Sequence, residues 1–113
     1  MTEKMLGKIS RATYGLGGYQ GVQLGIHLAF EGKGWGCGHS DCVWDYEFTE
    51  SPDAHTKWSE TDRTNRMITI NRKLSRFLKE AKVDSVSELA GIPVEVTFEN
   101  NGFKEFRILT EVL

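Results

Sequence analysis

The sequence predicts a small β-rich α+β domain with an antiparallel five-stranded sheet and one long helix. Three observations lead to this prediction. Apolar residues recur at spacings of three and four through the middle of the chain, as on one side of an amphipathic helix. The stretches before and after it alternate between apolar and polar residues, which is typical of half-buried strands. The final stretch also contains Asn101-Gly102, a strong signal for a hairpin turn.

The helix is expected from Glu60 to Lys82. Ser59 and Asp62 form an S-x-x-D start signal, in which a side-chain oxygen accepts hydrogen bonds from the free N–H groups of the first turn. The stripe expected to be buried consists of Met67, Ile70, Leu74, Phe77, Leu78 and Ala81. Burying it would contribute about 9 kcal/mol before the entropy cost, so the helix must pack on another element. The expected contact is the sheet face that bears Leu24, Ile26 and Leu28.

Three strands are expected before the helix and two after it. The expected ranges are 6–14, 22–30 and 43–48, then 94–98 and 106–112. The predicted order is therefore βββαββ, with the helix between strands 3 and 4. This order matches a small OB-like barrel, and an open antiparallel sheet with one helix on a face fits nearly as well.

Two glycine-rich segments, 15–21 and 32–38, separate the first three strands. A phosphate-binding loop is one interpretation of the first segment, but such a loop should open a helix. A strand follows here instead, so a turn or bulge is favoured. Tyr19 and Gln20 in this segment are candidate binding residues, and the second segment is expected to be a loop.

Composition limits the class of protein. The 113 residues predict a single domain, 1–113, and 39% hydrophobic with 27% charged residues is ordinary for a soluble globular protein. A net charge of −2 argues against a dedicated nucleic-acid binder while leaving room for a local basic patch. No apolar run could span a membrane, no signal peptide is visible, and two cysteines are too few for a disulfide framework. We therefore expect a reduced cytoplasmic protein without a membrane partner.

Four segments resemble a family of short bacteriophage and prophage proteins. These are GLGGYQ at 15–20, GWG at 34–36, GIPVEVTF at 91–98 and the C-terminal ILTEVL at 108–113. The resemblance implies a phage origin and the cytoplasm of a bacterial host. It implies no activity and assigns no functional residues.

Four residues could form a metal site: Cys37, His39, Cys42 and His55. Zinc prefers four Cys and His ligands in a tetrahedral array. The C-x4-C spacing is looser than the usual C-x2-C, so free thiols beside a solvated histidine are the favoured interpretation. No cofactor is therefore expected, and zinc is kept as an alternative.

Basic residues concentrate on the predicted helix. Seven of the fourteen Lys and Arg residues lie between Arg63 and Lys82, and Arg72, Arg76 and Lys79 stand opposite the apolar stripe on a helical wheel. A solvated polar face is the simplest interpretation. The functional one is an electropositive ridge for phosphates or for an acidic protein surface.

Acidic residues gather around the third predicted strand, at positions 41, 45, 47, 50 and 53. Paired carboxylates can divide general-acid and general-base roles, but surface clusters of this kind are far commoner. The chain is therefore expected not to be an enzyme.

These observations favour a small, non-enzymatic, phage-encoded binding protein that acts on a host protein or a nucleotide ligand in counter-defence. The alternative is an OB-like protein that binds single-stranded DNA in phage replication or recombination. That alternative uses the helix ridge, with Trp35 and Tyr19 as candidate stacking aromatics. A small zinc-binding domain is the third possibility.

Overall fold

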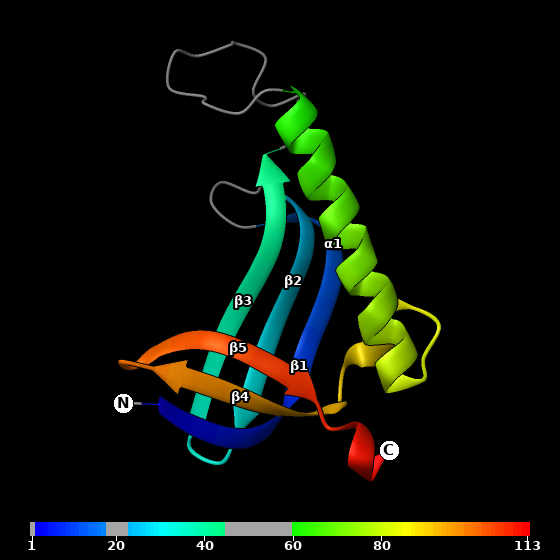
Figure 1. The fold of residues 1–113 in the computed structure, drawn as a ribbon. Helices are drawn as coiled ribbons and strands as arrows, with labels where there is room; N and C mark the ends of the chain where they lie inside the picture. Colours follow the sequence, from blue (N-terminus) through cyan, green and yellow to red (C-terminus); the bar gives the residue numbers. More distant parts are fainter. Residues whose placement is uncertain (1, 18–22, 45–59) are drawn as a thin grey trace.

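The computed structural model describes residues 2–17, 23–44 and 60–113 (Figure 1). The first three strands are β1 (Thr2–Gly17), β2 (Gln23–Gly32) and β3 (Trp35–Trp44). They precede the helix α1 (Glu60–Ala81) and the short 3₁₀ helix η3 (Val86–Leu89). The chain ends with β4 (Pro93–Glu99), β5 (Gly102–Ile108) and the 3₁₀ turn η4 (Thr110–Val112).

The strands form one sheet in the spatial order β3-β2-β1-β4-β5, and all neighbouring pairs are antiparallel. Strand β1 is shared between two ladders: residues 2–8 pair with β4, and residues 8–17 pair with β2. A bulge between Ile9 and Arg11 marks the change of partner. Bulges bend a strand and increase its twist. The sheet therefore curls into a half-barrel, with β4 and β5 crossing the other strands (Figure 1).

The coarse prediction, a β-rich α+β domain with five antiparallel strands and one helix, is confirmed. The spatial order is not the order along the chain, because β4 pairs with β1 and not with β3. Strands β3 and β5 are consequently the two edges of the sheet. No ladder joins them within the described residues, so the barrel is half open.

The second glycine-rich segment was expected to be a loop, and this expectation is wrong. Only Lys33 and Gly34 form the turn, and β3 already begins at Trp35. Gly36 and Gly38 lie within β3 although glycine is unfavourable in strands. They are held there because β3 pairs with β2 along the whole length of both strands. The expected strand 43–48 overlaps β3 only at 43–44, and its remainder lies outside the described residues.

The hairpin between β4 and β5 is confirmed, but its turn lies one residue earlier than predicted. Asn100 and Asn101 have φ of 53° and 68°, and Glu99 pairs with Gly102. Positive φ at both central residues is the conformation of a type I′ hairpin turn. Two consecutive asparagines supply it, so Gly102 is the first residue of β5.

The core fills the concave side of the half-barrel. Its most buried large side chains are Ile9, Ile26, Phe30, Ile70, Leu89, Val94 and Val96. Helix α1 lies over β3 and β2 (Figure 1). Ile70 is its most buried residue, and the other members of the expected stripe pack around it: Met67, Leu74, Phe77, Leu78 and Ala81. Ile26 and Leu28 are buried on β2 as expected, whereas Leu24 is half-buried.

No helix in the described ranges is both long enough and apolar enough to cross a membrane.

Substituting Ile70 should destabilise the domain strongly. Ile70→Ala removes a side chain that is 1% exposed and should cost about 2–5 kcal/mol in the free energy of unfolding. The matched control is Ile68→Ala on the same helix, because Ile68 is 45% exposed and should cost less than about 0.5 kcal/mol. Urea unfolding of both variants measures the difference. A cost below about 1 kcal/mol for Ile70→Ala would contradict the packing of α1.

Candidate functional site

A cleft of about 350 Å³ lies at the open side of the half-barrel, between β3, α1 and β5. We call it the edge cleft. Its apolar floor consists of Ile26 and Leu28 of β2. Its walls are formed by His39, Asp41, Lys73, Arg76, Phe77, Phe103, Lys104, Glu105 and Phe106. An apolar floor with a few polar groups above it is the usual composition of a small-molecule site.

Asp41 of β3 holds α1 in place beside the cleft. Its side chain is 8% exposed and accepts hydrogen bonds from the guanidinium of Arg66 and, at 2.8 Å, from Nζ of Lys73. Arg66 and Lys73 are seven residues apart, so they lie on the same side of the helix two turns from each other. A buried carboxylate requires such partners. We call these three residues the Asp41 clamp.

Aromatic rings connect the two sheet edges where no ladder does. His39 of β3 stacks on Phe103 of β5, with ring centroids 4.6 Å apart and an interplanar angle of 21°. Phe30 lies 5.8 Å from Phe103 and 4.8 Å from Phe106, and Phe77 of α1 lies 5.1 Å from Phe106. Pairs with such separations stabilise each other beyond the area they bury. The cluster therefore fixes the aromatic side of the cleft.

The His39 imidazole is neutral at physiological pH. Burial lowers its pKa below the ordinary value of 6.5, and the positive charges of Lys73 and Arg66 lower it further. Asp41 acts in the opposite direction. The cleft consequently presents a flat neutral ring stacked on Phe103, beside the positive charges of α1.

Arg76 is the cation of the cleft that no carboxylate in the described ranges neutralises. It is exposed, and its guanidinium lies 5.4 Å from the centre of the Phe77 ring, a cation–π separation. No carboxylate in the described ranges forms an ion pair with it. Lys104, on the opposite wall, pairs with Glu99 at 3.1 Å. Arg76 is therefore the cation best placed to meet an anionic ligand.

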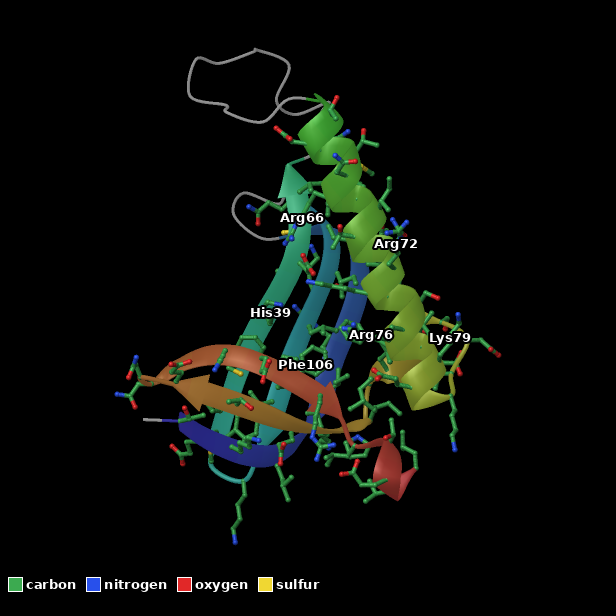
Figure 2. The ribbon with its side chains drawn as sticks, viewed as in Figure 1. His39, Arg66, Arg72, Arg76, Lys79 and Phe106 are labelled. Atoms are coloured by element: carbon green, nitrogen blue, oxygen red, sulfur yellow. The ribbon has the colours of Figure 1, made fainter. Side chains whose placement is uncertain are left out.

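The predicted ridge of Arg72, Arg76 and Lys79 does not form one site. Figure 2 shows Arg72 and Lys79 projecting from the side of α1 that faces away from the sheet. Arg76 instead lines the edge cleft. Its guanidinium lies over the ring of Phe77, the next residue, and thus beside the aromatic cluster.

Trp35, predicted as a stacking aromatic, is half-buried and packs against the core. Its ring meets Phe98 edge-on, with centroids 5.6 Å apart. A Cβ on Gly7 would lie 2.7 Å from this ring, and one on Gly32 would overlap its Nε1 atom. The two glycines thus leave the space that the indole fills, away from the cleft. The other binding candidates of the N-terminal half, Tyr19 and Gln20, lie outside the described residues.

The candidate metal ligands on β3 do not converge. Cys37 and His39 point to the concave side, whereas Cys42 points to the convex side, where its Sγ meets the Gln23 Oε1 atom at 3.5 Å. Alternation along a strand imposes this separation. In the described ranges, no three His, Cys, Asp or Glu residues are grouped so that they could hold a metal ion. His55 lies outside those ranges. Burial raises the pKa of both thiols, which keeps them protonated at neutral pH.

Sequence reasoning missed most of the cleft. Asp41 was one of several acids in a surface cluster, and Arg66 and Lys73 were two of many helix cations. The sequence contained one signal of this contact: Arg66 and Lys73 are seven residues apart and lie on the flank of the apolar stripe. Phe103 and Phe106 fall on a short strand, where apolar residues predict burial and not a ligand contact.

Comparison with protein-family models, with curated proteins and with solved structures finds no match to this chain.

The lowered pKa of His39 predicts a specific pH dependence. Its folded-state pKa lies below the unfolded value, so the unfolded chain binds the proton first as the pH falls. The stability contribution is therefore complete above about pH 6.5 and is lost as the pH falls below it. His39→Phe keeps a ring on Phe103 without titrating. Between pH 7.5 and 5.5, urea unfolding should show a larger loss of stability for the wild-type protein than for this variant. An equal loss in both would contradict the buried, neutral imidazole.

Proposed function

We propose that the chain is a small, non-enzymatic binding protein whose edge cleft takes a nucleotide-class ligand. The observation that supports this most directly is that Arg76 and the stacked rings of His39 and Phe103 line the same cleft of about 350 Å³. A nucleotide carries the two matching features, a flat ring and a phosphate.

The phosphate end of such a ligand would bind Arg76. A guanidinium binds phosphate oxygens in a bidentate manner, and no other ion pair in the described ranges occupies this one. Lys73 lines the same wall, but its Nζ already donates to Asp41. Arg76 therefore contributes the charge, and the Asp41 clamp keeps α1 at the correct distance from β3.

The base end would stack against the aromatic wall. The exposed fractions of His39 and Phe103 are intermediate, so parts of both rings can meet a ligand. Stacking of a base on an aromatic ring contributes about 1–3 kcal/mol. Because His39 is neutral, this contribution should be nearly independent of salt.

Binding without turnover is the role that best fits these groups. Asp41 is engaged by two cations and cannot serve as a free general base. Glu105 is exposed at the rim of the cleft and forms no ion pair in the described ranges. The resemblance to short phage proteins suggests the setting, a bacterial host cell. We propose that the protein acts there on a host factor or nucleotide in counter-defence.

Single-stranded DNA is the second candidate ligand. Its structural support is that β1 pairs with both β2 and β4, as in a partly open OB barrel. OB proteins bind strands on the face of their second and third strands. Between Gly25 and Glu31 on β2, and between Gly36 and Cys42 on β3, no residue on the convex face is Phe, Tyr or Trp, so this part of the face offers no such stacking platform. We therefore rank this function below nucleotide binding.

Charge reversal at Arg76 should weaken nucleotide binding strongly. Thermal shift with a panel of nucleotides should identify a ligand, and calorimetry should then show at least a tenfold loss of affinity for Arg76→Glu. The expected size follows from the loss of a charged hydrogen bond, about 1.5–3 kcal/mol. Arg72→Glu is the matched control, because it makes the same charge change on the outer side of α1 and should keep the affinity within about twofold.

Three outcomes of this experiment would count against the proposal. The first is that no nucleotide stabilises the protein, and the second is that both variants lose affinity equally. The third is that only a labelled oligonucleotide binds, with a log–log salt slope near −2. That slope would indicate about three phosphate contacts to a single strand and would favour the DNA-binding alternative.

A further inference from the structure

The convex face of the sheet holds a second group of reactive side chains, away from the edge cleft. His27 of β2 and Ser40 of β3 lie directly opposite each other in the ladder. The Nδ1 atom of His27 and the Oγ atom of Ser40 are 2.8 Å apart. This is the contact that a general base makes with a serine hydroxyl.

The surroundings of His27 fix the direction of this hydrogen bond. Its Nε2 atom lies 3.2 Å from the backbone oxygens of both Gly15 and Gln23. Carbonyl oxygens only accept, so Nε2 carries the hydrogen and donates it. In the neutral ring, Nδ1 is then the acceptor. Ser40 therefore donates its hydroxyl hydrogen to a basic nitrogen.

Glycine makes room for this arrangement. A Cβ on Gly17 would lie 2.9 Å from the His27 Nε2 atom, so no other residue fits there without moving the ring. The ring and the serine border a hollow of about 380 Å³ that Arg11 and Thr13 also line. Ser40 is exposed in this hollow. A small ligand can therefore reach its hydroxyl group.

We propose that Ser40 is a nucleophile that captures the acyl group of activated esters, with His27 as its general base. In this step Oγ of Ser40 attacks the carbonyl carbon and its proton moves to Nδ1 of His27. The bond from the carbonyl carbon to the leaving oxygen breaks, and the leaving alcohol takes the proton from His27. The products are a Ser40 ester and one free alcohol, so no oxidant or further reactant is required.

Two features of the hollow support the charges that develop in this step. The carbonyls of Gly15 and Gln23 accept from Nε2 and thus stabilise the imidazolium, as a backbone or carboxylate partner does in serine hydrolases. The cationic side chain of Arg11 lines the same hollow and attracts the oxyanion. Each protein molecule captures one acyl group and does not turn over, so this step is compatible with a binding role for the edge cleft. It does not depend on that role.

The test uses the full-length chain with two serine-directed probes, a fluorophosphonate and 4-nitrophenyl acetate. Peptide mass spectrometry should find the adduct on Ser40 at a rate at least tenfold above that of Ser10 and Ser75. Those two serines are exposed and have no histidine partner in the described part of the chain, so they are internal references. His27→Gln should lower the Ser40 rate at least tenfold, since general bases contribute about 10²–10⁴.

Two controls separate a chemical role from a structural one. Ser75→Ala removes an exposed hydroxyl group on α1, outside the hollow, and should leave the Ser40 rate unchanged. Unfolding curves show whether His27→Gln is folded; if it is not, His27→Asn, which also removes the basic ring nitrogen, replaces it. Equal labelling of all three serines, or a Ser40 rate that does not change when His27 is replaced, would overturn the proposal. The hydrogen bond would then serve only to join β2 and β3.

Discussion

The attachment of α1 to the edge of the sheet depends on one buried carboxylate. Asp41 lies on β3, an edge strand without a second neighbour in the described structure, and its side chain receives Arg66 and Lys73 from the helix. Both cations keep more than a third of their side-chain surface exposed, so their own desolvation is small. The carboxylate, in contrast, is nearly enclosed and would be costly to bury alone. The apolar stripe supplies most of the packing energy, and the clamp determines which strand the helix lies against.

The path of strand β1 produces the half-barrel. The path of β1 and the Asp41 clamp together produce the cleft. Because β1 bends at its bulge and divides its length between β2 and β4, the outer strands β3 and β5 approach each other without pairing. Aromatic stacking between His39 and Phe103 occupies part of this gap, and α1 borders the rest. Arg76 lines the opening from α1, the helix that the clamp joins to β3. The fold and the candidate site therefore depend on the same two features, the bent strand β1 and the buried carboxylate of Asp41.

Local sequence patterns predicted the helix and most of the strands, but they did not predict contacts between residues far apart in the sequence. The stripe around Ile70 and the alternation on β2 and β4 each depend on neighbours within one segment, so they were visible in the sequence. Trp35 to Gly38 was misassigned because glycines mask a strand whose pairing with β2 is non-local. The turn at Asn100 and Asn101 was displaced by one residue because Asn and Gly tolerate the same positive φ. The Asp41 clamp joins residues 25 and 32 positions apart, and no pattern in a single sequence specifies such a contact.

A double-mutant cycle between Asp41 and Lys73 is the most direct test of the clamp. The cycle comprises Asp41→Asn, Lys73→Met and the double variant, with the free energy of unfolding measured in urea for each. Methionine preserves the apolar stem of the lysine, so the cycle isolates the charge contact. If the clamp holds α1 to β3, the coupling energy should be about 0.5–3 kcal/mol. Additive effects, with a coupling below about 0.3 kcal/mol, would show that apolar packing alone positions the helix.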